Sequence, residues 1–275
     1  MLFRKAAVIG TGLIGGSLAL ALKKGGLARE VVGVSRHQGS LNSALRMKAI
    51  DRGSRSLDII KGADLVVLAT PVNIIIESRE RLLKIAGKDC LVTDVGSTKE
   101  KITALLERSF PNFVGAHPLA GSEKRGMANA RQDIFKDSLC ILTPTASTNA
   151  AALAKIRSLW TRMGAKVILL SPTQHDRALS FTSHLSHVIA FALMKSIPAG
   201  LLKFASGGLK DTTRIAASDP GLWQSIFLTN RTGILKALDL FEKNLREAKS
   251  AIRRGDARSL RRILKQAQKK RKSIE

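Results

Sequence analysis

Residues 8–22 read VIGTGLIGGSLALAL, and this stretch decides the fold. Three glycines in it have G-x-G-x-x-G spacing, after an apolar run that predicts a strand and before a pattern that predicts a helix. In that setting the first glycine permits a tight turn, the second lets the backbone approach a pyrophosphate, and the third allows close helix–strand packing. The stretch therefore predicts a dinucleotide site on a helix N-terminus. Its loop comprises Gly10, Gly12, Leu13, Ile14 and Gly15.

Apolar runs of strand length alternate with helical patterns through the first two-thirds of the 275 residues. The runs are rich in Val, Ile and Leu without clean alternation, which is typical of parallel strands buried on both faces. They span residues 5–10, 30–35, 64–70, 90–96, 112–117, 139–144 and 165–171. Strand–helix alternation predicts βαβ units, and hence an α/β fold with an N-terminal Rossmann-type doubly wound parallel sheet.

The pattern changes after Ser171, which suits a helix N-cap, with Pro172 at the first helical position. One long helix is expected over residues 171–197, and no further strand follows. We therefore expect a dinucleotide-binding domain at 1–171 and an all-α domain at 172–275. The helical region carries more apolar surface than so small a bundle buries alone, which predicts a homodimer through it.

Composition indicates a globular protein, with 44% hydrophobic residues and no apolar run near the ~20 residues that span a membrane. We expect no membrane association. Cys90 and Cys140 are too few and too scattered for a disulfide framework or a zinc site. They indicate buried free thiols in a reducing compartment, so we expect a cytoplasmic protein.

The net charge of +25 is partly local, because residues 243–275 hold thirteen Lys and Arg against three acids. A basic face can bind nucleic acid. The same segment also has the apolar spacing of a helix, as at Leu245, Ile252 and Leu260, which favours a solvated helix pair over nucleic-acid binding. A positive protein also attracts anionic substrates.

The residue after the second strand governs the choice of nucleotide, and in NAD-binding folds an acid there binds the ribose hydroxyls. Residues 31–38 read VVGVSRHQ, with Ser35 at the acidic position and Arg36 after it. A hydroxyl and a guanidinium suit a 2′-phosphate, which predicts NADP as cofactor and leaves NAD possible. The alternative is that Arg36 is an ordinary solvated loop residue.

Polar residues gather after three successive strands, at the edge where an α/β sheet binds its ligands. They are Thr70 and Pro71 in ATPVN (69–73), Ser97 in TDVGSTKE (93–100), and His117 in GAHPLAGSE (115–123). A neutral imidazole at His117 can accept a proton from a substrate hydroxyl while hydride leaves the same carbon. The alternative is a hydrogen-bonded structural histidine.

The helical region adds His184 and His187, three residues apart on one helix face. No H-E-x-x-H pattern or third ligand accompanies them, so we expect no metal and interpret them as substrate-binding or interior histidines. Arg214 can hold a carboxylate in bidentate fashion. The alternative is an ion pair of Arg214 with Asp211 or Asp219.

Five stretches together resemble the prephenate/arogenate dehydrogenases of tyrosine biosynthesis: GTGLIGGSLALAL, VTDVGSTK, GAHPLAGSEKRG, SHLSHVIAFAL and GGLKDTTRIAASDPGLW. They appear in family order and cover nearly the whole chain. The resemblance implies a Rossmann domain followed by a helical domain that forms an intertwined dimer. It also implies oxidative decarboxylation of prephenate to 4-hydroxyphenylpyruvate, or of arogenate to tyrosine, with hydride transfer to NADP or NAD.

The resemblance also assigns residues. His117 matches the catalytic histidine that hydrogen-bonds the ring C4 hydroxyl, Ser97 a serine that contacts that hydroxyl, and Arg214 the arginine that holds the ring carboxylate. The remaining matches are Glu123, His184 and His187 near the substrate side chain, Asp211 at the pocket entrance, Trp223 reaching across the dimer, and a further histidine, His175.

Two other functions compete with this one. A β-hydroxy-acid type of Rossmann-plus-helical dehydrogenase would use Lys195 or Lys203 as acid/base, but it leaves GAHPLAG (115–121) unexplained. A non-enzymatic NADP-sensing or nucleic-acid-binding protein would use the basic tail and show steeply salt-dependent binding without turnover.

Overall fold

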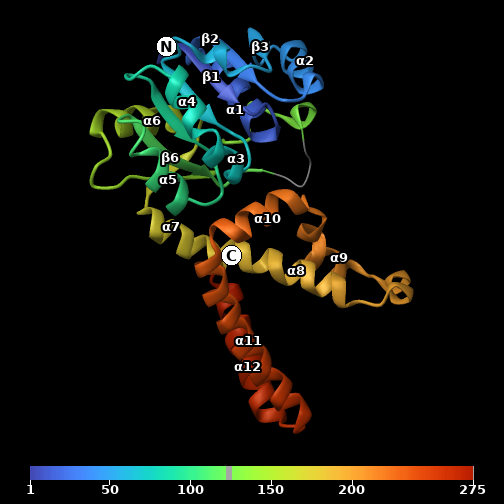
Figure 1. The fold of residues 1–275 in the computed structure, drawn as a ribbon. Helices are drawn as coiled ribbons and strands as arrows, with labels where there is room; N and C mark the ends of the chain where they lie inside the picture. Colours follow the sequence, from blue (N-terminus) through green and yellow to red (C-terminus); the bar gives the residue numbers. More distant parts are fainter. Residues whose placement is uncertain (122–125, 275) are drawn as a thin grey trace. The chain divides into compact units, whose positions relative to one another are not determined.

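The computed structural model describes residues 1–121 and 126–274 (Figure 1). Contacts divide the chain into two compact units, Met1–Asn230 and Arg231–Glu275. The first unit contains one eight-stranded sheet and the helices up to α10. The domain boundary expected near residue 171 coincides with the start of helix α7 and stays a prediction.

The sheet has the strand order β3-β2-β1-β4-β5-β6-β7-β8. Neighbouring strands are parallel except β6 and β7, which are antiparallel. This confirms the predicted doubly wound α/β fold. The strands are β1 (Phe3–Ile9), β2 (Ala28–Val34), β3 (Arg52–Ser54), β4 (Leu65–Leu68), β5 (Leu91–Asp94), β6 (Phe113–Pro118), β7 (Leu139–Thr143) and β8 (Lys166–Leu169). Strand β3 escaped prediction because its three residues, RGS, contain no apolar run.

Alternate residues of the central strands pack into two separate cores, one on each face of the sheet. On β1, Ala6 and Val8 belong to one core, and Ala7 and Ile9 to the other. Burial on both faces explains why the strands lack polar alternation in sequence. The first core includes α1 (Leu13–Lys24), α2 (Gln38–Arg46) and α6 (Ala150–Arg162), and the second includes α3 (Val72–Glu77), α4 (Arg79–Ile85) and α5 (Glu100–Leu106).

The winding of the sheet reverses between β1 and β4, which are neighbours although β2 and β3 lie between them in sequence. Ligands of such sheets bind outside the carboxyl ends of the strands at this point. Gly10 follows β1 there with φ +101°, and a Cβ on it would lie 2.5 Å from the carbonyl oxygen of Ala69. A Cβ on Gly15 would lie 1.9 Å from the carbonyl oxygen of Gly10. The turn into α1 therefore requires both glycines.

A helical run follows the sheet within the first unit. Ser171 caps it as predicted, in a capping box with Gln174. The expected single helix over 171–197 contains a π-helical turn, a feature frequent at functional sites. The run comprises α7 (Pro172–Leu179), the π-helical turn η3 (Ser180–His184), α8 (Leu185–Ser196), α9 (Gly207–Thr213) and α10 (Pro220–Thr229). Short 3-10 turns complete the unit: η1 (Leu57–Ile60), η2 (Met127–Asn129), η4 (Ala199–Phe204) and η5 (Arg214–Ala217).

Helix α10 is attached to the carboxyl edge of the sheet by two hydrogen bonds. The backbone N–H of Asn73 donates to Ser225 Oγ at 3.1 Å. The Thr98 hydroxyl donates a hydrogen bond to Thr229 Oγ1 at 2.9 Å. Asn73 lies in the first turn of α3, after β4, and Thr98 lies in the loop after β5, so α10 closes over the same edge at which the glycine turn opens.

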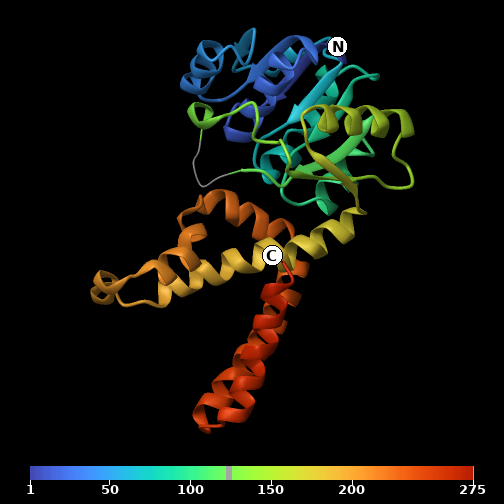
Figure 2. The same cartoon turned by 180° about the vertical axis from the view of Figure 1, so that it is seen from behind.

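The second unit is a pair of helices, α11 (Arg231–Arg253) and α12 (Ala257–Lys272), which lie side by side in both views (Figure 2). Asp256 caps α12 by accepting from the backbone N–H of Ser259 at 3.0 Å. The basic residues of α12 are exposed, as expected for a solvated pair. The apolar side chains of Leu245, Ile252 and Leu264 are exposed as well.

Cys90 and Cys140 are both buried and unpaired, as predicted. Within residues 1–121 and 126–274, no helix combines the length and the apolar character needed to cross a membrane.

We expect Gly15→Ala to destabilise the chain by about 3 kcal/mol or more, because the new Cβ collides with backbone that cannot rotate away. Chemical denaturation measures this loss. Gly39→Ala on α2 is the matched control, since its Cβ would meet nothing within 4 Å, and it should leave stability unchanged or raise it slightly. Equal stability of the two variants would contradict the packing argument.

Candidate active site

A cavity of about 840 Å³ lies in the first unit, at the carboxyl edge of the sheet. Its walls combine the glycine turn, the loops after β4, β5 and β6, and residues of η3, α8, η5 and α10. Most of the predicted site residues meet here. Those in the lining are Gly12, Leu13, Ile14, Thr70, Pro71, Ser97, His117, His184, His187, Arg214 and Trp223.

The other predicted residues lie elsewhere in the described part of the chain. Gly10 and Gly15 shape the turn behind the lining. Ser35 and Arg36 follow the end of β2, and Asp211 is exposed on α9. Glu123 lies outside the residues that the structure describes.

The glycine turn fits a dinucleotide. A Cβ added to Gly12 would meet no heavy atom within 4 Å, so the backbone there faces open space in the cavity wall. The first turn of α1 contains no acidic residue, which leaves its amide donors and positive helix end available to phosphates. The residues that would hold the nucleotide in this cavity are Gly12, Leu13, Ile14, Thr70 and Pro71.

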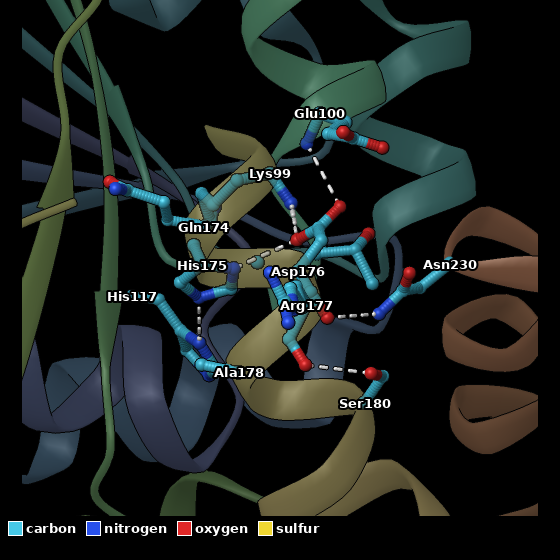
Figure 3. Close-up of polar contacts among 12 residues, drawn as sticks. Lys99, Glu100, His117, Gln174, His175, Asp176, Arg177, Ala178, Ser180 and Asn230 are labelled. Carbon is cyan, nitrogen blue, oxygen red and sulfur yellow. Dashed lines mark hydrogen bonds and ion pairs between the residues drawn. The ribbon is translucent and has the colours of Figure 1, made fainter. Parts of the chain in front are cut away.

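His117 stands at the end of β6 with 9% of its surface exposed, and it lines the cavity. Its Nδ1 atom lies 2.8 Å from Nε2 of His175, and the two rings are tilted by 59° (Figure 3). His117 therefore borders the cavity while its Nδ1 atom contacts a residue of the interior.

His175 and Asp176 continue this contact into the protein. His175, on α7, is fully buried, and its Nδ1 lies 2.8 Å from Asp176 Oδ1 (Figure 3). The Asp176 carboxylate also accepts the backbone N–H of Lys99 at 2.7 Å and that of Glu100 at 3.0 Å. These amides begin α5, so Asp176 caps one helix from another.

A buried ion pair lies beside the two histidines. Lys99 Nζ contacts Asp94 Oδ2, and both side chains have no exposed surface. Asp94 also accepts the backbone N–H of Gly96 at 2.8 Å and that of Ala116 at 3.3 Å. The pair therefore connects the end of β5 with the segment that carries His117.

Burial lowers the pKa of His117 well below its usual value, and the charges of His175, Lys99 and His184 act in the same direction. Burial also lowers the pKa of His175, opposed by its hydrogen bond to Asp176. Both rings are consequently neutral near pH 7. A neutral ring is the form that can accept a proton.

His184 is positioned by η3 and is almost fully buried. The Asn230 amide donates to its Nδ1 at 3.1 Å and to the backbone carbonyl of Asp176 at 2.8 Å. Burial lowers the pKa of His184 to about 4. The ring therefore enters the cavity wall uncharged, with Nδ1 occupied as an acceptor.

His187 stacks on Trp223 with ring centroids 3.4 Å apart and an interplanar angle of 21°. Its Nδ1 donates to the Ser183 carbonyl at 3.0 Å, which leaves Nε2 as an acceptor. Burial lowers its pKa, and the nearby Arg214 guanidinium acts in the same direction. In the described ranges no group of three His, Cys, Asp or Glu side chains is placed to hold a metal.

Sequence reasoning missed the interior support of the site. Asp176 and Asn230 carry no spacing signal, because the Lys99 and Glu100 amides that Asp176 binds and the His184 ring that Asn230 binds are distant in sequence. Asp94 and Lys99 are only five residues apart, but no motif marks them as a buried pair. The one local hint was His175-Asp176, a histidine–acid pair in the first turn and a half after a strong helix cap.

Two family models match the chain, and together they cover most of it. The prephenate dehydrogenase nucleotide-binding domain matches residues 18–169, and the prephenate dehydrogenase dimerization domain matches residues 171–266. The chain belongs to the prephenate dehydrogenase family. It is therefore a dehydrogenase, and its reaction is an oxidative decarboxylation in tyrosine biosynthesis. The helical region is the dimerization domain of the family.

Individual relatives agree. The chain is 35% identical to a cyclohexadienyl dehydrogenase of Zymomonas mobilis, covering 99% of this chain and 96% of that protein. It is similar to the crystal structure of prephenate dehydrogenase from A. aeolicus in complex with hydroxyphenyl propionate and NAD+, with a TM-score of 0.93, 35% identity and 99% and 98% of the two chains covered. It is also similar to Synechocystis arogenate dehydrogenase, with a TM-score of 0.83, 30% identity and 99% and 100% coverage.

We expect acid to destabilise this family member through its buried histidines. The folded-state pKa of His184 is about 4 against 6.5 for the free side chain, so the unfolded state takes up the proton first and stability falls as pH drops from about 6.5 toward 4. In His184→Gln the loss between about pH 7.5 and about pH 5 should shrink by about 2 kcal/mol. Urea titrations across this range measure it.

His37→Gln, which replaces an exposed histidine, is the control and should keep the wild-type slope. An unchanged slope in His184→Gln would contradict the burial argument.

Proposed function

We propose that the chain catalyses the oxidative decarboxylation of prephenate, arogenate or both, with NADP as the preferred hydride acceptor, in the cytoplasm. The observation that carries this proposal is the position of His117. It lines a cavity whose walls also hold the glycine turn and the Arg214 guanidinium. A base, a nucleotide loop and a carboxylate-binding group thus share one space.

The residues in the cavity suit the individual requirements of the reaction. A nicotinamide bound in this cavity would supply the hydride acceptor for C4 of the substrate ring. His117 accepts the C4 hydroxyl proton at the same time, which turns the alcohol into a ring ketone. Loss of the ring carboxylate as CO2 then yields an aromatic phenolate, and His117 returns the proton to its oxygen. Ser97 belongs to the same lining, and we expect its hydroxyl to hydrogen-bond that oxygen.

Both substrates are carboxylates, and the cavity offers groups that bind them. Arg214 suits a bidentate contact with the ring carboxylate. The Nε2 acceptor of His187, held by stacking on Trp223, and the neutral His184 ring surround the remaining space for the side chain. Asp211 on α9 and Glu123 complete the proposed substrate residues. Orientation of C4 against the cofactor then supplies much of the rate enhancement.

The proposed preference for NADP rests on the turn after β2. Ser35 accepts the backbone N–H of His37 at 3.2 Å, so its hydroxyl sits in the turn, and Arg36 is exposed next to it. An acid at this position would repel a 2′-phosphate, whereas a hydroxyl and a guanidinium attract it.

The alternative, a β-hydroxy-acid type of dehydrogenase, would need Lys195 or Lys203 as its acid/base. Lys195 and Lys203 are both exposed, and neither lines the cavity in the described chain. Solved 3-hydroxybutyryl-CoA dehydrogenases resemble the chain at 16% identity, a likeness of fold alone.

We expect His117→Asn to lower kcat with prephenate or arogenate by at least about 10³-fold, because the amide cannot accept the hydroxyl proton. Affinity for NADP, measured by fluorescence titration, should stay within about threefold, since the glycine turn is untouched. Wild-type turnover in this variant would rule out His117 as the base and would overturn the proposed function.

We expect Arg36→Ala to raise KM for NADP by at least about tenfold, because a charge-assisted contact with the 2′-phosphate is worth about 1.5–3 kcal/mol. KM for NAD in the same variant is the internal control and should not change. Ser35→Asp should reverse the preference toward NAD. Initial rates with both substrates crossed against both nucleotides measure all three effects, and a wild type that prefers NAD would contradict the assignment.

A further inference from the structure

We propose that His175 and Asp176 act as positioning residues, which fix the proton of His117 on Nδ1 and so keep its Nε2 free to accept the substrate hydroxyl proton. This proposal rests on the proposed role of His117 as the base. It concerns residues that lie outside the cavity lining in the described chain and act through a chain of hydrogen bonds.

The first link is set by the carboxylate. Asp176 Oδ1 accepts the Lys99 amide at 2.7 Å and lies 2.8 Å from His175 Nδ1, and Oδ2 accepts the Glu100 amide. A carboxylate surrounded by donors accepts from every neighbour. His175 Nδ1 therefore carries a proton and donates it to Asp176.

The second link follows from the first. A neutral imidazole has one N–H and one acceptor nitrogen, so a His175 ring protonated on Nδ1 offers a lone pair at Nε2. That atom lies 2.8 Å from His117 Nδ1, a distance that requires one proton between the two nitrogens. His117 Nδ1 must supply it. The other ring nitrogen of His117, Nε2, is then an acceptor.

Two other arrangements of the protons on His175 are disfavoured. A His175 proton on Nε2 alone would place a lone pair at Nδ1 against an Asp176 oxygen 2.8 Å away. Two protons on His175 would create a cation with no exposed surface, close to the Lys99 ammonium, and burial lowers the pKa of this histidine.

The same chain stabilises the charged form of His117 during the reaction. Once Nε2 has taken the hydroxyl proton, the imidazolium donates through Nδ1 to His175, and the negative charge of Asp176 stands behind that ring. In the described part of the chain, the other charged or titratable groups facing the pair are Lys99 and Asp94, which neutralise one another, and His184, which is uncharged. The buried Cys140 thiol contacts the His117 backbone, and burial raises its pKa, so it stays neutral. Asp176 thus supplies the unbalanced negative charge of this interior cluster.

The carboxylate is itself held rigidly, which positioning requires. The two α5 amides fix its oxygens, and the Asn230 side chain binds the backbone carbonyl of the same residue at 2.8 Å. A residue that only capped α5 would need no histidine beside it. The fixed orientation of His175 between a carboxylate and a cavity-lining ring indicates a role for the whole chain of contacts.

The test compares three variants of the full-length protein. His175→Leu removes the link with little change in volume. His175→Gln retains it, because Asp176 binds the amide NH2 group and turns the amide oxygen toward His117 Nδ1. Thr93→Val is the matched control, since it deletes a buried hydrogen bond, from Thr93 Oγ1 to the Val114 carbonyl at 2.7 Å, outside the cavity lining.

We expect His175→Leu to lower kcat by about 10²-fold with KM and NADP affinity little changed, and His175→Gln to recover at least about tenfold of that loss. Thr93→Val should lose stability, seen as a lower Tm, without loss of kcat. Wild-type kcat in His175→Leu, or equal loss in His175→Gln and His175→Leu with both variants folded, would overturn the proposal.

A spectroscopic measurement keeps this test separate from the proposed function. In 15N-histidine NMR spectra of the wild type, His117 should carry its proton on Nδ1, and His175→Gln should preserve that tautomer. In His175→Leu the proton should move to Nε2. If wild-type His117 carries its proton on Nε2, the proposed positioning is overturned, whether or not the enzyme converts prephenate or arogenate. Absence of turnover with the Nδ1 tautomer present overturns only the proposed reaction.

Discussion

The arrangement of the cavity residues depends on the hydrogen bonds that the Asp176 carboxylate accepts. It lies on α7, the first helix after the sheet, yet it accepts the amides that begin α5 on the sheet edge. Without it, the buried N–H of Lys99 and the part-buried N–H of Glu100 would lose this partner, and an unsatisfied buried donor costs about 1–3 kcal/mol. The same group orients His175, and through it His117. One side chain therefore contacts both the start of α5 and the histidine that orients His117, the proposed base.

The chain combines a net charge of +25 with an active site in which histidines stay neutral. The two facts are compatible because they act at different distances. The surplus lysines and arginines lie largely on exposed surface, where solvent and salt screen them, and they draw anionic substrates toward the protein. Inside, burial is the largest cause of the low pKa of each cavity histidine. A base that must accept a proton from an alcohol benefits from starting uncharged, and desolvation provides this.

The sequence predicted the sheet and the cofactor turn because these depend on local patterns. Apolar runs mark seven of the eight strands, and the glycine spacing marks a turn that leaves no room for a Cβ at Gly10 or Gly15. Position after a strand also predicted that Ser97 and His117 would meet at one edge, and both line the cavity. The interior support escaped because it depends on tertiary contacts. His175 lies 58 residues from His117, and Asn230 lies 46 residues from His184, with no periodicity connecting them. The π-helical turn that carries His184 also escaped prediction, because the sequence pattern around it is that of a continuous helix.

The two sides of the cavity supply different groups, and this difference explains why a histidine suits the position at the end of β6. The sheet edge supplies the glycine turn and the proposed base, His117, and residues of α7, η3, α8, η5 and α10 line the rest of the cavity. A histidine at a strand end has a rigid backbone, but its ring can adopt either tautomer. In an imidazole, a hydrogen bond at one nitrogen can fix the tautomer while the other nitrogen accepts a proton. Lysine has a single nitrogen and cannot be oriented in this way. In the proposed positioning, the pairing of His117 with a second, carboxylate-bound histidine thus lets α7 determine which nitrogen of His117 carries the proton.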